Sequence, residues 1–447
     1  MHKRTLIQNA TLVNEGEAFT GSLLIENHHI EEVLMGQDAC PTCPPDEVID
    51  ATGLVLLPGV IDTHVHMRDP GLTHKADMKS ESRAAAAGGV TTVIDMPNTL
   101  PQTTTSEALK EKEAIAARKC LVNYGFMIGA TNDNADELRH LNRREVAAIK
   151  VFMGSSTGNM LVDREEVLAR LFAESRLPIV THCEDTALIA ENAKLIQAEH
   201  GEDPDVSLHS LIRSEEACYR STAMAVRLAR ENGTRLHVAH VSTARELSLF
   251  DPTAYPHITA EACVPHLLYC DEDYARLGTR IKCNPAIKTA ADRDALRRAL
   301  TDGPIASIAT DHAPHLLREK RGGALRAVSG MPMVQFSLTA MLDLVSRKVL
   351  TLPQLVQLMC HAPAHIFDIE NRGHLRPGYK ADLVLVRPHA PWTLTPNRIE
   401  SKCNWSPMEG HTFGWTVEKT FCNGYLLYNH GHITDEDHKG QAITYAR

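Results

Sequence analysis

The stretch Gly-Val-Ile-Asp-Thr-His-Val-His at residues 59–66 has the pattern of a buried strand that ends in polar side chains. Short apolar, β-branched runs of this kind recur along the chain, and Ala-, Glu- and Arg-rich segments follow most of them. The runs are Gly59–His66, Val90–Met96, Val122–Gly129, Ala148–Met153, Pro178–His182, Leu236–His240, Ile258–Cys263 and Ile305–Thr310. Buried strands that alternate with helices predict parallel β-α-β units, and eight such units predict a closed (β/α)8 barrel of the α/β class.

The segments between these runs have helical patterns, most clearly at Glu107–Ala117, Arg164–Glu174, Glu215–Glu231 and Val334–Val345. An open, doubly wound sheet would use the same units. Its nucleotide-binding form has no signature here, because no Gly-x-Gly-x-x-Gly follows an early strand. The barrel is therefore the favoured architecture.

The two ends of the chain resemble each other in their sequence pattern, which differs from the pattern of the middle. Short alternating strands are predicted at Leu6–Val13, Ser22–Ile25, Glu47–Leu57, Ala381–Val386, Val417–Phe421 and Tyr425–Tyr428. We expect the ends to pair into one small composite β-sandwich domain beside the barrel. Residues 1–57 and 371–447 are assigned to this domain, and residues 58–370 to the barrel.

The composition is that of a soluble globular protein: 43% of the 447 residues are hydrophobic, 23% are charged, and the formal net charge is −10. Lys and Arg are spread along the chain, so no basic stripe indicates nucleic acid as a partner. The longest apolar runs, such as Leu54–Val60, are too short to cross a membrane. A small-molecule substrate and a cytoplasmic location are expected, and a homodimer or higher homo-oligomer is compatible with the sequence.

Eleven scattered cysteines do not form the pattern of a disulfide framework. Cys40 and Cys43 make a lone Cys-x-x-Cys in a Pro-rich stretch. No second pair follows at zinc-ribbon spacing, so free thiols in a loop are the favoured interpretation.

Polar side chains end several of the predicted strands on the side where such a barrel places its active site. His64 and His66 are two residues apart in a strand, so both point toward the barrel mouth. His182, His240 and Asp311 end three other runs. One histidine at a strand end is usually structural, and paired histidines also occur in cores. Four histidines and an aspartate at the same end of separate strands indicate a metal site.

Lys150 lies in a run that is otherwise apolar, where an unpaired ammonium group would be costly. It could reach the barrel mouth along its own stem or pair there with a carboxylate. The functional alternative is carboxylation of the amine by carbon dioxide. Burial favours the neutral amine that this reaction needs, and two divalent metals would stabilise the anionic product as a bridging ligand.

With His64-x-His66, Lys150, His182, His240 and Asp311 in this order, the chain resembles the amidohydrolase superfamily, and within it the dihydroorotases. The resemblance covers essentially the whole chain. It implies two zinc ions bridged by carboxylated Lys150 and a hydroxide, with His64, His66 and Asp311 on one ion and His182 and His240 on the other. Asp311 would also be the catalytic proton carrier.

The segment Arg68-Asp69-Pro70-Gly71 is similar to the dihydroorotase pattern, in which the arginine holds the substrate carboxylate. The same resemblance implies substrate contacts from Asn98, Asn284 and His315. Asn98 could instead cap a turn, and His315 could anchor the loop after the last strand. Allantoinases usually carry Asn-Glu-Pro-Gly at this place, and dihydropyrimidinases usually have a tyrosine soon after the bridging lysine, where this chain has Gly154-Ser155-Ser156.

The resemblance implies reversible cyclisation of N-carbamoyl-L-aspartate to dihydroorotate, a step of pyrimidine biosynthesis. Allantoinase, another cyclic amidase and a catalytically silent scaffold subunit are the alternatives. Some bacterial dihydroorotases have an aspartate where Lys150 stands. Lys150 aligns this chain with the branches that use a carboxylated lysine, or with a branch intermediate between the dihydroorotases and the allantoinases. His266 is interpreted as structural, and Arg213 and Glu216 are expected to form an ion pair near the mouth.

Overall fold

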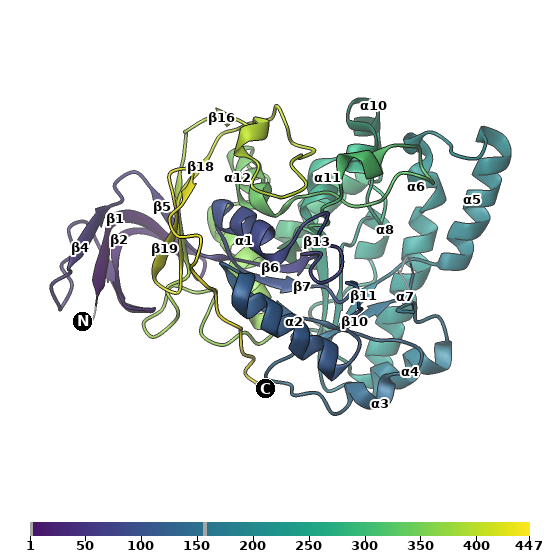
Figure 1. Cartoon of the computed structure of the whole chain (residues 1–447), viewed down its shortest axis with the longest axis horizontal. Coiled ribbons are helices and arrows are strands. Elements are labelled where there is room, and N and C mark those ends of the chain that lie inside the picture. The colour runs from purple at the N-terminus through teal and green to yellow at the C-terminus, as the bar shows by residue number, and fades with distance from the viewer. Residues whose placement is uncertain (1–2, 155–158) are drawn as a thin grey trace.

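The computed structural model describes residues 3–154 and 159–447, and the parallel strands at its centre lie among helices (Figure 1). In chain order these strands are β6 (Val60–Val65), β7 (Val90–Asp95), β8 (Asn123–Phe126), β9 (Ile128–Gly129), β10 (Ile149–Phe152), β11 (Ile179–His182), β12 (Leu236–Val238), β13 (Ile258–Cys263) and β14 (Ile305–Ala309). Each lies within one of the runs predicted from the sequence. β8 and β9 share one run and are separated only by Met127.

Backbone pairing closes these strands into a ring. Strands β6, β7 and β8 form one parallel sheet, and strands β9 to β14 form a second. The gap between β14 and β6 is bridged just beyond the strand ends, where His66 N donates to His312 O at 2.7 Å and Val65 pairs with His312. The predicted (β/α)8 barrel is therefore confirmed.

Helices cover the outside of the ring. The longer ones are α1 (Met78–Ala87), α2 (Ser106–Lys119), α4 (Glu165–Glu174), α5 (Thr186–His200), α7 (Glu215–Asn232), α11 (Ala290–Asp302) and α12 (Ser337–Ser346). The shorter ones are α3 (Ala135–Leu138), α6 (His209–Ile212), α8 (Ala244–Leu247), α9 (Val264–Leu268), α10 (Tyr274–Leu277), α13 (Leu352–Val356) and α14 (Ala362–Ile366). No described helix is long and apolar enough to span a membrane.

Helix α7 shows how local sequence sets the helix boundaries. Ser214 caps its first turn by accepting from Ala217 N, and Gly233 ends it in the left-handed region at φ 67°. The face that includes Ala225, Leu228 and Ala229 is buried against the barrel. The predicted helix Glu215–Glu231 thus matches within one residue.

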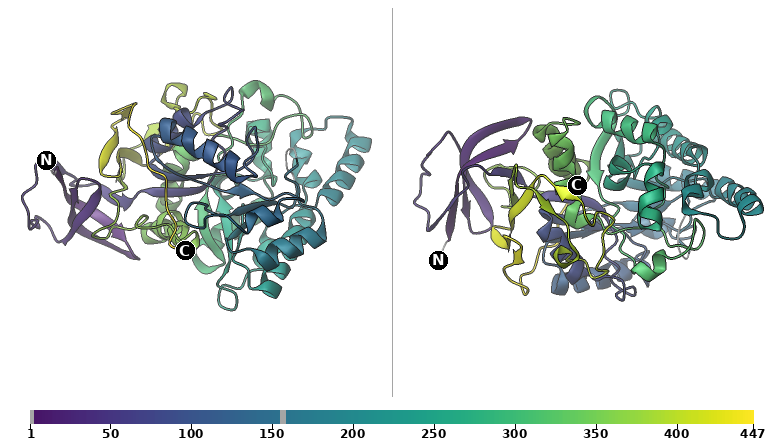
Figure 2. Two further views of the ribbon diagram at one scale, coloured as in Figure 1. Left: turned by 60° about the horizontal axis from the view of Figure 1, so that its bottom comes forward. Right: turned by 90° about the horizontal axis from the view of Figure 1, so that it is seen from above.

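Both ends of the chain meet in one sheet beside the barrel, where the purple and yellow strands of Figure 2 lie side by side. Its strands are β1 (Arg4–Asn14), β2 (Glu17–Glu26), β3 (His29–Met35), β4 (Glu47–Asp50), β5 (Val55–Pro58), β15 (Leu383–Arg387), β18 (Thr416–Cys422), β19 (Tyr425–Asn429) and β20 (His432–Ile433). Strand β5 joins the two ends, because it pairs in parallel with β1 and antiparallel with β15. A short hairpin, β16 (Trp392–Thr393) with β17 (Thr412–Phe413), lies apart from this sheet.

Three details of this sheet differ from the prediction. Strands β3 and β20 were not anticipated. The single strand expected at Glu47–Leu57 is two strands, β4 and β5, because the chain turns between them at Gly53 with φ 78°.

Candidate metal centre and substrate cavity

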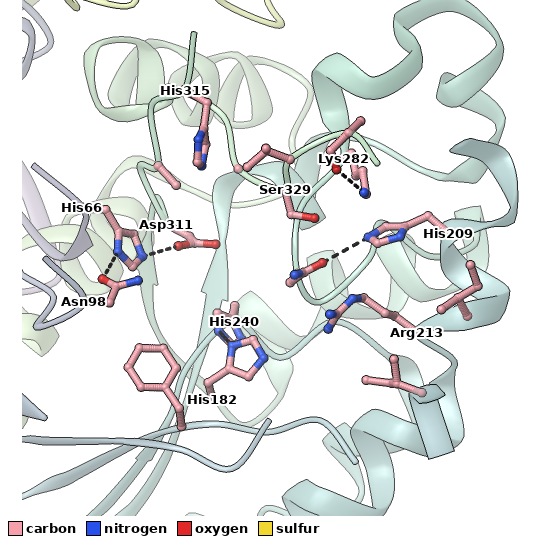
Figure 3. Close-up of a pocket in the computed structure, with 18 of the residues that line it drawn as sticks. His66, Asn98, His182, His209, Arg213, His240, Lys282, Asp311, His315 and Ser329 are labelled. Carbon is pink, nitrogen blue, oxygen red and sulfur yellow. Dashed lines mark hydrogen bonds and ion pairs between the residues drawn. The ribbon is translucent and has the colours of Figure 1, made fainter. Parts of the chain in front are cut away.

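A cavity of about 510 Å³ opens at the carboxyl ends of the barrel strands (Figure 3). Every site residue predicted from the sequence lines it: His64, His66, Arg68, Asn98, Lys150, His182, His240, Asn284, Asp311 and His315. Parallel strands of a closed barrel bring their carboxyl ends to one mouth, so residues far apart in sequence meet there.

One half of the cavity brings together His64, His66 and Asp311. His66 Nε2 lies 3.0 Å and His64 Nε2 lies 3.4 Å from Asp311 Oδ1. The other nitrogen of each ring is held from behind: His64 Nδ1 is 2.7 Å from Glu261 Oε1, and His66 Nδ1 is 2.7 Å from Asn98 Oδ1. Because those oxygens only accept, each Nδ1 donates and each Nε2 turns a lone pair toward Asp311. The two Nε2 lone pairs and the Asp311 carboxylate oxygen therefore face one another, and a bound divalent cation would stabilise this arrangement.

The other half contains His182 and His240, from strand β11 and the end of β12. His182 Nδ1 lies 2.9 Å from His240 Nε2. On its far side, His182 Nε2 lies 2.8 Å from Glu184 Oε2, and the His240 backbone N donates to Glu261 Oε1 at 3.1 Å. Two ring nitrogens therefore face each other, while carboxylates hold the opposite side of the pair.

The protonation states suit metal binding. Burial lowers the pKa of His66 to about 4 and also lowers the pKa values of His182 and His240, so these rings are neutral at neutral pH. Burial alone would raise the pKa of Asp311, but the nearby His64 and His66 lower it to about 2. Neutral imidazoles with an ionised carboxylate are a donor set that zinc and similar divalent metals prefer.

Lys150 lines the cavity from β10 and is completely buried. Its Nζ lies 5.2 Å from the centroid of the Phe152 ring and has no hydrogen-bond partner among the described residues. Burial lowers the pKa of this amine. An orphaned, buried amine facing this donor set fits a group that is completed by carboxylation and metal binding, and it does not fit the pairing with a carboxylate considered above.

Backbone strain collects at the same place. Arg68, His240 and Asp311 have φ values of 65°, 40° and 48°, in the left-handed region that residues with a Cβ rarely adopt. Such conformations cost roughly 1–3 kcal/mol each and cluster at functional sites. Three of the candidate site residues therefore have backbone geometry that costs stability.

A cationic end of the cavity is built around Arg68, which is buried. Arg68 Nη2 lies 3.0 Å from His315 Nε2, and Lys75 Nζ lies 3.0 Å from His315 Nδ1. Both cations only donate, whereas a neutral imidazole has a single acceptor nitrogen, so His315 can satisfy just one of them. Glu319 pairs with Lys75 at 2.9 Å. Burial lowers the pKa of Arg68 only to about 10, so it stays charged.

The two candidate asparagines both line the cavity and both contact a histidine. Asn98 Oδ1 accepts from His66, as described above. Asn284 Oδ1 lies 3.1 Å from His209 Nε2, a buried histidine that sequence analysis did not single out. Ser155 and Ser156, which stand where dihydropyrimidinases usually have a tyrosine, lie outside the described residues.

Two buried carboxylates of the site were also missed. Glu184 follows His182 by two residues, and Glu261 lies on β13, a strand for which no polar role was predicted. Burial alone would raise the pKa of Glu184, but Arg213 and His182 hold it well below its usual range. The spacing His182-x-Glu184 was the one signal in the sequence that could have identified such a partner.

The prediction of an ion pair between Arg213 and Glu216 is wrong, because the two side chains pair with other residues. Arg213 precedes α7, points toward the cavity and pairs with Glu184 (Figure 3). Glu216 lies on the exposed face of α7, where it pairs with Arg220 and Arg245.

Two of the other expectations concern residues outside the site. His266 is buried and its Nε2 donates to Pro285 O at 3.0 Å, a structural contact as predicted. The cysteines are all free, and Cys40 and Cys43 are not linked to each other.

Fold and site together define a hydrolase barrel with a candidate metal centre. The model of the Amidohydrolase family matches residues 55–427, and the chain belongs to this family. A dihydroorotase from Halobacterium salinarum is 37% identical over 356 residues, which cover 80% of this chain and 82% of the relative. An allantoinase from Escherichia coli is 30% identical over 440 residues, covering 95% of each. An L-hydantoinase from Arthrobacter aurescens superimposes with a TM-score of 0.94 over 99% of this chain and 100% of that one, at 26% identity.

Proposed function

We propose that the protein is a zinc-dependent dihydroorotase that interconverts N-carbamoyl-L-aspartate and (S)-dihydroorotate. The observation that carries this proposal is Arg68, a buried guanidinium at the end of the cavity next to the candidate metal centre. Several relatives at 31–37% identity over most of the chain are named dihydroorotase, which supports the same substrate.

The cationic end of the cavity suits a carboxylate. Arg68 Nε donates to Pro314 O at 3.0 Å, while Arg68 Nη2 and Lys75 compete for one imidazole acceptor, so an entering carboxylate would give the outer guanidinium nitrogens a charged acceptor. A guanidinium can bind both carboxylate oxygens with a fixed orientation, which a lysine cannot do. The ring of His315 lies at this end, and the amide of Asn98 lines the same cavity beside His66, so both could orient the carboxylate further.

The candidate metal centre would hold two zinc ions, one on His64, His66 and Asp311 and one on His182 and His240, with carboxylated Lys150 as a ligand common to both. When bound, such ions supply an activated water at neutral pH and a Lewis acid for the ring carbonyl. Neutral imidazoles and an orphaned lysine amine are the features of this chain that support the assignment.

Asp311 has the properties of the proton carrier. Its carboxylate is ionised at neutral pH and points into the cavity, so an oxygen can accept the proton of the attacking water. The same oxygen then returns the proton to the departing ring nitrogen. In the cyclisation direction Asp311 takes the proton from the ureido nitrogen as this nitrogen attacks the side-chain carboxylate. Asp311 passes that proton to the carboxylate oxygen that leaves, which becomes water with a second proton from solvent, while Arg68 keeps the α-carboxylate away from the reacting centre.

Purified protein loaded with zinc tests this proposal when it is assayed with dihydroorotate, allantoin and hydantoin in parallel. We expect turnover of dihydroorotate at least roughly 100-fold above the other two, because only dihydroorotate offers Arg68 a carboxylate. Metal content is measured on the same sample. Preference for allantoin or hydantoin would contradict the proposal.

Allantoinase is the second candidate, because the allantoinase relative covers nearly the whole chain at an identity only slightly lower. It predicts turnover of allantoin with no dependence on Arg68. A silent scaffold subunit is disfavoured because the candidate ligands and Arg68 are all present and lie in one cavity.

A further inference from the structure

A chain of contacts runs outward from the candidate metal centre through Glu184 to Arg213. Glu184 is completely buried, and its Oε2 lies 2.8 Å from His182 Nε2. The same oxygen accepts from Arg213 Nη1, and Arg213 lines the cavity wall between α6 and α7. None of these contacts involves the substrate groups assigned above.

We propose that Glu184 and Arg213 are positioning residues that fix the tautomer and the ring orientation of His182, and so set the affinity of the metal held by His182 and His240. The proposal rests on the proposed metal centre and is independent of which cyclic amide is the substrate.

Hydrogen-bond chemistry supports the role of Glu184 in fixing the tautomer of His182. A carboxylate only accepts, so the proton of the His182 ring is on Nε2 and the lone pair is on Nδ1. Nδ1 is the atom that faces His240 Nε2 at 2.9 Å. A carboxylate behind a ligating histidine is the common way in which proteins orient the ring and increase its basicity.

Charge balance supports the role of Arg213 in holding the Glu184 carboxylate. Glu184 Oε1 is buried without a hydrogen-bond partner among the described residues, so the carboxylate depends on Oε2 and on its partners there. Arg213 supplies the compensating charge from a side chain that is only 16% exposed. Without it, a buried carboxylate would face a neutral imidazole alone, which is costly.

The two halves of the centre differ in this respect. Glu261 holds His64 Nδ1 at 2.7 Å in the same way. Its side-chain partners are His64, His237, Thr63 and Cys263, all buried. The carboxylate behind His182 is instead anchored by an arginine of the cavity wall. The His182 half can therefore be weakened by a substitution on the wall, away from the ligands.

The test is metal binding by Glu184→Gln, measured without substrate. The variant keeps the size of the side chain and loses the charge. Against a competing chelator, we expect the zinc held by His182 and His240 to lose about 10- to 100-fold in affinity, as for other partners of ligating histidines. The absorption spectrum of the Co²⁺-loaded protein should change as well. Glu216→Gln, which removes a carboxylate paired with arginines on the exposed face of α7, is the matched control and should change neither.

Arg213→Met gives a second test if Glu184→Gln fails to fold, because Arg213 lines a cavity wall that apolar side chains such as Ile189 and Ile212 also line. It should weaken the same zinc ion, and Arg213→Lys should recover part of the loss because it restores the charge. Wild-type zinc affinity and an unchanged Co²⁺ spectrum in folded Glu184→Gln or Arg213→Met would overturn the proposal. A protein that proves inactive on dihydroorotate but shows the loss of zinc affinity would overturn the proposed substrate and leave this inference standing.

Discussion

The mouth of the barrel and the sheet formed by the chain ends are built in opposite ways. At the mouth, buried imidazoles, carboxylates, an arginine and a lysine lie together on strained backbone. In the sheet, side chains such as Ile7, Leu12, Leu23, Leu56 and Leu383 are completely buried in an apolar cluster. Burying polar groups and straining the backbone cost free energy, whereas packing apolar groups gains it.

This contrast indicates which substitutions change activity and which change stability. Substitutions at the mouth should lower activity, because they remove reacting or binding groups that contribute little to the free energy of unfolding. Changes in the sheet remove packing from groups that are far from the cavity.

The largest loss should follow removal of metal. A strong chelator followed by gel filtration should lower activity by at least roughly 1000-fold, since water is a poor nucleophile at neutral pH without a metal. Zinc added back should restore activity. Far-ultraviolet circular dichroism of the metal-free protein serves as the control for folding. Full activity in metal-free protein would contradict the assignment of the chemistry to a metal centre at the barrel mouth.

Lys150→Ala should come next, with a loss on the order of 1000-fold or about 4 kcal/mol of barrier. The reason is that carboxylated Lys150 would be the shared ligand of both ions. Short carboxylic acids such as acetate or propionate should restore part of the activity by occupying the space left by the side chain. The carboxyl group itself is checked by intact mass under gentle ionisation and by ¹³C NMR with labelled bicarbonate. A variant with wild-type activity would show that the lysine has no part in the centre.

Leu12→Ala in the terminal sheet should change activity least. A completely buried leucine replaced by alanine typically costs about 2–5 kcal/mol of unfolding free energy. Denaturant titration measures that loss, and kcat/KM per folded molecule should stay within about twofold of wild type. A large drop in kcat/KM in fully folded protein would mean that the sheet and the site are coupled.

Much of the fold could be predicted because its signals are local. Each barrel strand is a short apolar run, and each ligand candidate ends such a run, so the closed barrel brings them together without further information. Strand β3 was missed because a charged edge strand such as His29–Met35 has no clear alternation of polar and apolar residues. The turn at Gly53 was missed because the residues on its two sides were interpreted as one continuous strand. Tertiary pairing decides both of them.

The site partners show the limit most clearly. The carboxylate of Glu261 meets His64 from 197 residues away, so no spacing in the sequence indicates the contact. Arg213 and Glu216 are three residues apart, which favoured an ion pair between them. The helix begins between them, so the two side chains point to different surroundings. Local spacing predicted the ligand candidates but not the groups that hold them.

If the candidate metal centre does the chemistry and Arg68 selects the substrate, Arg68→Met should change the substrate preference and leave the metal centre intact. The kcat/KM of this variant is measured with dihydroorotate and with dihydrouracil, the same ring without the carboxylate, alongside zinc content. Loss of a charge-assisted contact should cost about 2–4 kcal/mol with dihydroorotate. The ratio of the two kcat/KM values should therefore fall roughly 30- to 1000-fold, with zinc content unchanged because a guanidinium is no metal ligand. An unchanged ratio would contradict the account.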